Sequence, residues 1–504
     1  MKTDLILINP EKMNKTGLFT MASCIRKQGF NVKIFDGTLK HIKKCLIKEY
    51  KKNFVPLVGI TCMSVNANSA YELCRFIKKR ISSKVLCAVG GFHASALMEK
   101  IFEESNFDYV IYGEGEITMH ELVERITRGN VLTDVEGTLC RIDGKIIRNK
   151  PRELIQDLDT IPWPAYDLVN FFDYIIEVRR GKRRYSRGTI IMLERGCMFD
   201  CVFCSSKLIW QKRIRRHSVK YSIDFIKWVV KKYDLNSFII LDDEFFGNHK
   251  WVEEFCNEFI KQGLKKKIKG WECMGRVTLV TPSLLSKLKE AGCFSIRFGM
   301  ESGSEKSLKY FKKGSAKVKD NLKAIKMCKD AGIQSLGTFL IGAPDETMDD
   351  ILDTIDFIET SGVDQAEIFI VTPLPATDIW ETATKRNFLK ENLKWSELFF
   401  QNAPTSAILR NSNFTAEQLF NIRNYIHHKV IMPHDHGKKP LKLNHRKEIE
   451  KILQGDTTNC YFSLRQNIYR YIMMGKEAIR YPRKLYKFVK LKILYGNKPH
   501  GIHT

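Results

Sequence analysis

The chain has 504 residues, of which 44% are hydrophobic, and it carries a formal net charge of +26. This length allows two or three domains, and no uncharged apolar run reaches the roughly 18 residues that a membrane-spanning helix needs. The N-terminal MKTDLILINP lacks the pattern of a secretion signal, so we expect a cytoplasmic protein whose 14 cysteines are not paired in disulfides. A charge of this size leaves nucleic acid, an anionic membrane surface and anionic cofactors open as partners.

Short apolar runs alternate with helix-like segments from residue 4 to about residue 145. The runs DLILINP, NVKIFDG, PLVGITCM, KVLCAVGG and DYVIYGEG each have the composition of a buried strand followed by a turn. Strands that alternate with helices predict a doubly wound, Rossmann-like parallel sheet that binds ligands at the carboxyl ends of its strands. We therefore expect residues 1–145 to form a first α/β domain. A hairpin expected at GTLCRIDGKIIRN begins the transition to the linker.

Residues 146–187 contain the proline-rich IPWPAYDL and the basic RRGKRRYSRG, which are typical of a linker. From residue 188 to residue 385 the alternation resumes with six strand-like runs: TIIMLERG, SFIILDDEFF, KGWECMGR, FSIRFGMES, QSLGTFLIG and AEIFIVTPL. Six units predict a partial (β/α)6 barrel with its active site at the carboxyl ends of the strands. Residues 386–504 are expected to be a helical, basic C-terminal region, in which Arg465–Tyr495 is basic and amphipathic.

Three cysteines lie close together in ERGCMFDCVFCSS, at Cys197, Cys201 and Cys204. A structural zinc site needs a fourth cysteine or histidine, usually in a closely spaced pair, and His217 and Cys256 do not form such a pair. A four-iron cluster can take three thiolates and leave one iron open to a substrate or cofactor. Because the cysteines directly follow a strand-like run, at the rim where barrels carry their active sites, the spacing C-x3-C-x2-C favours an iron–sulfur cluster over zinc.

The segment CMFDCVFC followed by βα repeats resembles the radical S-adenosylmethionine (SAM) enzymes. The resemblance implies a [4Fe-4S] cluster on the three cysteines, with SAM bound to the open iron through its amino and carboxylate groups. It also implies that one-electron reduction of SAM yields a 5′-deoxyadenosyl radical, which abstracts hydrogen from an unactivated carbon. A flavodoxin or a ferredoxin is the electron donor expected for such an enzyme.

Three further segments resemble SAM-binding motifs of this family in the same order. LDDEFFGN stands where the family often has Gly-Gly-Glu-Pro, RFGMESGS resembles its ribose-contacting segment, and GTFLIGAPDET resembles its adenine-side motif. The glycines of the first motif are absent, so contacts from Asp242, Asp243 or Glu244 stay open. Arg276 and Arg297 are candidates to pair with the SAM carboxylate, and an ion pair within the barrel rim is the alternative. The SAM-binding residues that the resemblance implies are Phe203, Glu244, Arg276, Arg297, Glu301, Ser302, Phe339 and Ile341.

The first domain resembles the cobalamin-binding module that precedes many radical SAM domains, through GITCMSVNANSAYEL, VGGFHASAL and DYVIYGEGEIT. Glycines in its loops let the backbone approach a large flat ligand closely. The D-x-H-x-x-G motif that supplies an axial histidine to cobalt is absent, so we expect no imidazole ligand, and His93 contacts the corrin edge or caps a helix. The cobalamin contacts that the resemblance implies are Thr61, Ser64, Asn66, Gly90, Gly91, His93, Gly113, Glu114 and Gly115.

Two reactions fit this combination of domains: methyl transfer to an unactivated carbon, and oxidative cyclisation or rearrangement similar to that of the anaerobic porphyrin cyclase. The basic C-terminal segment favours a small, lipophilic or natural-product substrate and contact with a membrane surface, and a solvated basic helix pair is the alternative. A tRNA methylthiotransferase shares the cysteine motif but also needs further cluster cysteines and a small RNA-binding barrel, so nucleic acid is a less favoured partner. A cobalamin or redox sensor without catalysis would not need the SAM-like segments.

Four histidines in HHKVIMPHDHG resemble a metal site at first sight. Their spacing does not give a helical i, i+4 pair with a distant third ligand. We therefore expect His427, His428, His434 and His436 to lie in a solvent-facing loop.

Overall fold

A computed structural model describes residues 2–10, 16–130, 132–180, 183–398, 408–435 and 443–456. Its first sheet has the strand order β2-β1-β3-β4-β5-β6-β7. The first five strands are parallel, and the predicted hairpin, β6 and β7, adds two antiparallel strands that carry the sheet to Arg148, past the expected limit at residue 145. The strands are β1 (Leu5–Pro10), β2 (Val32–Gly37), β3 (Leu57–Thr61), β4 (Leu86–Gly90), β5 (Tyr109–Ile111), β6 (Thr138–Ile142) and β7 (Lys145–Arg148).

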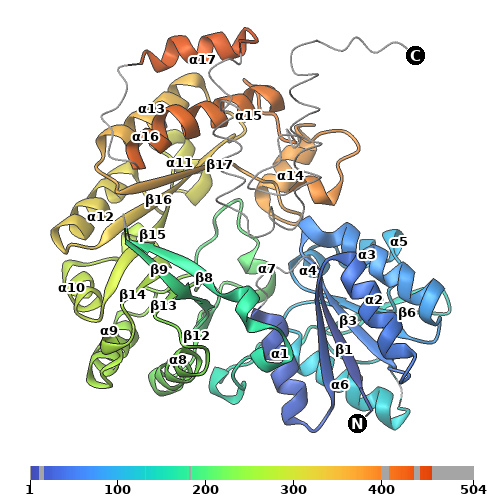
Figure 1. The fold of residues 1–504 in the computed structure, drawn as a ribbon. Coiled ribbons are helices and arrows are strands. Elements are labelled where there is room, and N and C mark those ends of the chain that lie inside the picture. Colours follow the sequence, from blue (N-terminus) through green and yellow to red (C-terminus); the bar gives the residue numbers. More distant parts are fainter. Residues whose placement is uncertain are drawn as a thin grey trace, which may run out of the picture.

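Helices cover both faces of this sheet (Figure 1), which explains why β1 is buried at every position. Leu5 and Leu7 pack into the core formed with α1 and α6, whereas Ile6 and Ile8 pack into the core formed with α2 and α3. The helices are α1 (Thr16–Lys27), α2 (Leu39–Tyr50), α3 (Ala67–Phe76), α4 (Phe92–Leu97), α5 (Ile101–Glu104) and α6 (Glu116–Arg128). The ligand crevice of such a sheet lies at the carboxyl ends of β1 and β3, where the strand order reverses.

The second sheet contains the six predicted parallel strands in the order β10-β13-β14-β15-β16-β17. Helices follow its outer, convex side (Figure 1), as expected for part of a βα barrel. The strands are β10 (Ile190–Ile191), β13 (Ser237–Ile240), β14 (Gly270–Gly275), β15 (Cys293–Glu301), β16 (Gln334–Ile341) and β17 (Gln365–Ile370). The helices are α8 (Val219–Tyr233), α9 (His249–Lys261), α10 (Pro282–Glu290), α11 (Glu305–Lys312), α12 (Val318–Asp330) and α13 (Met348–Thr360).

Two short antiparallel pairs flank this sheet. The hairpin of β8 (Ile176–Arg180) and β9 (Arg183–Gly188) precedes it. A ribbon of β11 (Glu194–Arg195) and β12 (Arg215–Arg216) brackets the three cysteines. The first strand of the sheet is therefore shorter than its sequence suggested, because the chain leaves the sheet after Ile191 and pairs with β12 instead.

The C-terminal region adds helices beside the end of the second sheet. The expectation of loop histidines was wrong for His427, His428 and His434, which lie in a helix that continues α15 (Ala416–Tyr425), because apolar side chains such as Ile426 and Val430 bury one side of this segment. His436 and the basic segment 465–495 lie outside the described residues. The other elements here are α14 (Asp378–Lys385), η9 (Trp395–Leu398), η10 (Ile426–Ile431), α16 (Met432–Asp435) and α17 (His445–Leu453).

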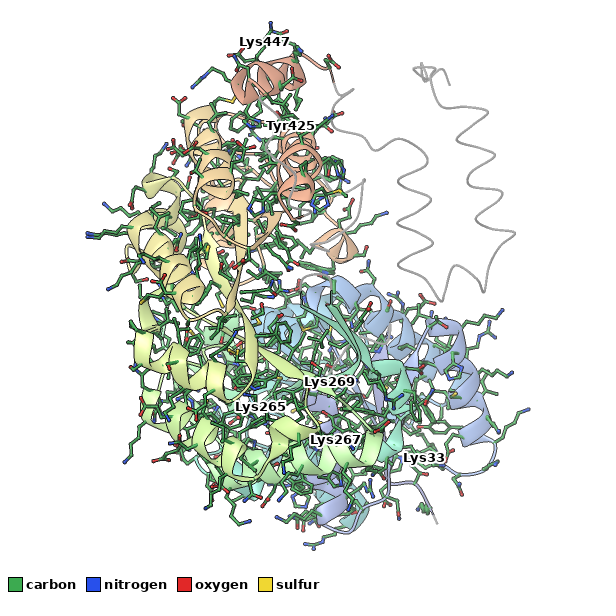
Figure 2. All side chains as sticks on the ribbon, turned by 60° about the vertical axis from the view of Figure 1, so that its left-hand side comes forward. Lys33, Lys265, Lys267, Lys269, Tyr425 and Lys447 are labelled. Atoms are coloured by element: carbon green, nitrogen blue, oxygen red, sulfur yellow. The ribbon has the colours of Figure 1, made fainter. Side chains whose placement is uncertain are left out.

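Lysines on the outside of the molecule account for part of the net charge. Figure 2 shows Lys33 and Lys447 at the edges of the molecule, and Lys265, Lys267 and Lys269 together near the amino end of β14. The lysines near β14 are at the opposite end of that strand from the expected active site. In the part of the chain that the structure describes, no helix combines the length and apolarity needed to cross a bilayer.

Candidate functional site

The loop of residues 197–204, here called the cysteine loop, begins directly after β11. Gly196 has a φ of +97°, and a Cβ at this position would overlap the carbonyl oxygen of Arg213. No other residue fits this turn without strain. The backbone before Gly196 is fixed by Asp242, which follows β13. Oδ1 of Asp242 accepts hydrogen bonds from the N–H groups of Leu193 (2.7 Å) and Glu194 (3.3 Å). The three cysteines therefore leave a well-fixed strand end.

The surroundings of the cysteines fit thiolates that bind a cluster. Burial raises the pKa of Cys197 to about 12 and that of Cys204 to about 11, so a bound metal is needed to keep these groups deprotonated near neutral pH. Nη1 of Arg276 lies 3.6 Å from Sγ of Cys201, and this guanidinium also stacks on the Phe199 ring at 3.8 Å. Such a cation stabilises the negative charge of thiolates.

No three His, Cys, Asp or Glu side chains among the described residues converge on the position of a single metal ion. In a four-iron cluster each cysteine binds a different iron, so the three sulfur atoms need not converge in this way. The donor set therefore fits a cluster on Cys197, Cys201 and Cys204, and it does not form a mononuclear site.

A second buried cation, Lys312 at the end of α11, was not found from the sequence. Its Nζ lies 2.7 Å from Oε1 of Glu301, and both side chains are at most 8% exposed. Glu301 has a φ of +63°, which is uncommon for a residue other than glycine and is typical of functional sites. The register between β15 and β16 shifts at this point, between Gly299 and Glu301. The spacing of the lysines in α11 does not indicate that the Lys312 side chain is buried.

Glu244 also lies beside the cysteine loop, and Phe203 belongs to it. Burial raises the pKa of Glu244 to about 7, while its Oε1 accepts hydrogen bonds from the N–H groups of Phe246 (3.2 Å) and Arg276 (3.3 Å). Phe203 packs edge-on against Phe311, with 6.1 Å between ring centroids. The structure therefore brings Phe203, Glu244, Arg276 and Glu301 together around the cysteines.

The other residues expected to bind SAM point elsewhere. The hydroxyl of Ser302 is fully buried and lies 2.9 Å from Oγ1 of Thr354 on α13. Phe339 and Ile341 belong to the core between β16 and the outer helices, where Phe339 contacts Phe357 at 5.8 Å. Because side chains alternate along a strand, Leu340 is the side chain that faces the cysteine loop side, and it packs against the cluster of apolar residues that includes Val202.

Arg297 forms the ion pairs that were the alternative to SAM binding. It pairs with Glu367 on β17, and its Nε lies 3.6 Å from Oε1 of Glu272 on β14. Two carboxylates therefore flank one guanidinium on the concave side of the sheet, and burial raises the pKa of Glu272. This places negative charge in the barrel interior below Glu301.

A cavity of ≈ 340 Å³ lies between the carboxyl ends of the first sheet and the chain around the cysteine loop. We call it the interdomain cavity. The first sheet contributes Gly59, Thr61, Gly90, Gly91, Gly113, Glu114 and Gly115, and the second domain contributes Met192, Glu194, Arg195, Ile209, Trp210 and His217. Gly91 is required by the backbone, because its φ is +108° and a Cβ there would lie 2.7 Å from the carbonyl oxygen of Cys62. Glu114 lines the cavity, but both of its carboxylate oxygens are paired with arginines.

The structure does not bring Ser64, Asn66 and His93 to this cavity. His93 is 1% exposed, with Nε2 2.9 Å from the Tyr71 hydroxyl and Nδ1 2.9 Å from the Ser64 hydroxyl. Oδ1 of Asn66 accepts a hydrogen bond from the N–H of Met63 (2.8 Å). These three side chains build the loop after β3 rather than line the cavity. His93 also packs edge-on against Trp395 of η9, at 4.9 Å between ring centroids.

Comparisons with known proteins agree with this two-part site. The B12 binding domain family matches residues 10–123, and the radical SAM superfamily matches residues 191–358. An uncharacterized methyltransferase of Pyrococcus horikoshii is 33% identical over 405 residues, which cover 80% of this chain and 84% of that protein. The anaerobic magnesium-protoporphyrin IX monomethyl ester cyclase of Rubrivivax gelatinosus is 28% identical over 72% of this chain and 64% of its own length.

Solved structures show the same fold. The radical SAM methyltransferase TsrM from Kitasatospora setae superposes with a TM-score of 0.65 at 17% identity, over 81% of each chain. The expected fold, an N-terminal Rossmann-like domain followed by a partial barrel, is thereby confirmed. The chain is an enzyme that belongs to the radical SAM family with an N-terminal cobalamin-binding domain, whose cofactors are a [4Fe-4S] cluster, SAM and cobalamin.

Proposed function

We propose that the chain is a methyltransferase that acts on an unactivated carbon of a small lipophilic or natural-product molecule. The observation that carries this proposal is the position of the interdomain cavity. Its walls include the glycine loops of the first sheet and also Arg195 and Trp210, which lie two residues before Cys197 and six residues after Cys204. A cobalamin in this cavity and a cluster on the cysteine loop would therefore both face one substrate.

Each part of the chain has a separate task in this proposal. Cys197, Cys201 and Cys204 hold the cluster, and Arg276 and Lys312 balance its negative charge. Arg276 also orients the SAM carboxylate, and Glu244, whose raised pKa reflects its burial, accepts from the SAM amino group. When bound, the cluster supplies the electron that cleaves SAM, and cobalamin supplies the methyl group. Residues 1–148 are the proposed cobalamin-binding part, and residues 188–385 the proposed radical SAM part.

The proposals on partners rest on the sequence. The basic, amphipathic residues 465–495 suit an anionic membrane surface and hence a lipophilic substrate. A flavodoxin or a ferredoxin is the proposed electron donor. The charged group Glu272–Arg297–Glu367 adds one requirement, because a substrate that reaches the barrel interior must carry polar atoms to meet it.

Oxidative cyclisation is the second candidate reaction. It is supported by the likeness to the magnesium-protoporphyrin cyclase, which extends through both domains. The residues that hold the cofactors are the same in both proposals, so the reaction depends on the substrate and on how it is placed between the cofactors.

Anaerobic incubation of the reconstituted protein with SAM, cobalamin and a reductant separates these candidates. Formation of 5′-deoxyadenosine together with S-adenosylhomocysteine supports methyl transfer, whereas 5′-deoxyadenosine alone supports cyclisation. Cys201→Ala should abolish 5′-deoxyadenosine formation, and Cys45→Ala, on the outer helix α2, is the matched control that should retain it. Full SAM cleavage by Cys201→Ala would overturn the assignment of the cluster.

A further inference from the structure

Four buried, charged side chains join the first domain to the chain beside the cysteine loop. Arg195 donates from Nη1 to Oε1 of Glu114 and from Nη2 to Oε1 of Glu116, at 2.6 Å in each case. Arg215 donates from Nη1 to Oε2 of Glu114, at 2.8 Å. These side chains are at most 12% exposed. We call Glu114, Glu116, Arg195 and Arg215 the interdomain clasp.

The geometry of the β11–β12 ribbon explains why the clasp needs both domains. Arg195 and Arg215 are directly opposite each other in this antiparallel pair, and like charges in opposite positions destabilise a ribbon. The neighbouring Arg216 already pairs with Glu194, at 2.6 Å. Glu114 and Glu116 of the first domain therefore supply the two negative charges that balance Arg195 and Arg215.

The clasp links the two halves of the site over a short stretch of chain. Glu114, in the loop after β5, and Glu116, the first residue of α6, flank Gly115, and all three line the interdomain cavity. Arg195 is two residues before Cys197, and the constrained Gly196 lies between them. Six residues after Cys204, the Trp210 ring lies 5.7 Å from the guanidinium carbons of both Arg195 and Arg215. The clasp therefore contacts the chain on both sides of the cysteine loop.

We propose that the interdomain clasp sets the separation between the cluster and the cobalamin; this inference rests on the proposed function. Arg195 and Glu114 are positioning residues, because their polar atoms are used in pairing with each other and with Arg215 and Glu116. A substrate that must meet both cofactors needs them at a fixed spacing, since small misplacements of reacting groups are costly. The clasp also explains why Glu114 lines the cavity without a free oxygen for a ligand.

The spacing is measurable by electron paramagnetic resonance, because cob(II)alamin and the reduced cluster are both paramagnetic. In the wild-type holoenzyme, the reduced cluster should speed the spin relaxation of cob(II)alamin. Arg195→Lys keeps the positive charge but loses the fork that spans two carboxylates. We expect it to bind both cofactors and to lose most of this relaxation enhancement. Glu121→Gln, on the same helix as Glu116 but paired with Arg125 of that helix and with Arg152 of the linker, is the matched control that should retain it.

Retention of the wild-type enhancement by Arg195→Lys, with both cofactors bound, would overturn the clasp proposal. If Arg195→Lys fails to fold, Glu116→Gln tests the same point, because it removes one carboxylate and leaves the pairs of Glu114 intact. Loss of enhancement in Glu116→Gln supports the proposal, and wild-type enhancement contradicts it. Absence of the cobalamin or cluster signal from the wild-type protein would overturn the proposed function itself, which separates the two failures.

Discussion

The ammonium of Lys312 lies 2.7 Å from a carboxylate oxygen of Glu301, and both side chains are at most 8% exposed. Removing one partner of a buried ion pair leaves an uncompensated charge and costs about 3–5 kcal/mol. We therefore expect Lys312→Met to lower the free energy of unfolding of the cofactor-free protein by about 3 kcal/mol. The double variant Lys312→Met/Glu301→Gln should recover at least about 1 kcal/mol of this loss. Chemical denaturation of the wild-type protein, Lys312→Met, Glu301→Gln and the double variant measures the coupling energy between the two side chains.

Lys326→Met is the control for this cycle, because Lys326 forms an exposed pair with Asp330 on α12. Exposed pairs of this kind contribute about 0.3–0.5 kcal/mol. Strictly additive effects of Lys312→Met and Glu301→Gln would show that the pair is not coupled in the folded protein.

Arg276 should affect SAM binding more than cluster binding. Arg276→Lys keeps a positive charge near Cys201 but loses the planar group that stacks on Phe199 and that can pair with a carboxylate in two places. We expect unchanged iron content and SAM affinity weaker by about tenfold, equivalent to about 1.4 kcal/mol. Iron analysis and SAM titration of the reconstituted protein test this. Unchanged SAM affinity would show that Arg276 does not contact SAM.

Gly59 should control access of cobalamin to the deepest part of the interdomain cavity. A Cβ at this position on β3 would lie 2.7 Å from Cε of Met119 and 2.9 Å from Cδ2 of Leu7, and both of these side chains line the cavity. In Gly59→Ala the Met119 side chain must move, and we expect it to enter the cavity and weaken cobalamin binding by about tenfold. Spectroscopic titration with cobalamin measures the affinity. Gly29→Ala, whose added Cβ meets no neighbour, controls for the loss of a glycine outside the cavity, at the cost of some strain at a positive φ.

His93 should make the stability of the first domain depend on pH. Burial lowers the pKa of His93 to about 4, so the folded protein binds this proton less readily than the unfolded chain, whose histidines titrate near pH 6.5. The contribution of neutral His93 to stability is therefore complete above pH 6.5 and is lost as the pH falls toward 4. Wild-type protein should lose about 1–3 kcal/mol more stability over this interval than His93→Gln.

Thermal or chemical unfolding at several pH values measures this difference. Parallel pH profiles of the two proteins would contradict the buried, neutral state of His93. Cobalamin bound to His93→Gln should have the same paramagnetic resonance spectrum as in wild-type protein, because His93 lies outside the cavity.

Much of the fold follows from local sequence patterns. Runs such as LILINP, in which Asn9 is the one polar side chain, are otherwise apolar because both faces of a parallel sheet are covered, and this pattern is visible without the structure. The cysteine spacing is equally visible, because all three ligands lie within eight residues of one loop. The end of the first sheet was less clear, because β7 is exposed and lacks the apolar pattern of the other strands.

The direction of single side chains could not be predicted in the same way. Resemblance placed Phe339 and Ile341 in the correct strand, but the face to which they point depends on packing against α13. Lys312 was missed because it is one lysine among many, and only the fold buries it beside Glu301. Glu114 was expected to contact cobalamin, and its pairing with Arg195 depends on two segments 81 residues apart in the chain. Such long-range pairs leave no local pattern.

The central claim is that the cluster on Cys197, Cys201 and Cys204 has one open iron that binds SAM. Pulsed electron–nuclear resonance of the reduced protein with SAM labelled with nitrogen-15 at its amino group and carbon-13 at its carboxylate tests this most directly. We expect hyperfine coupling of both labelled nuclei to the cluster in wild-type protein, and no such coupling in Cys201→Ala. A reduced four-iron cluster in wild-type protein that shows no coupling to either label, at saturating SAM, would contradict it.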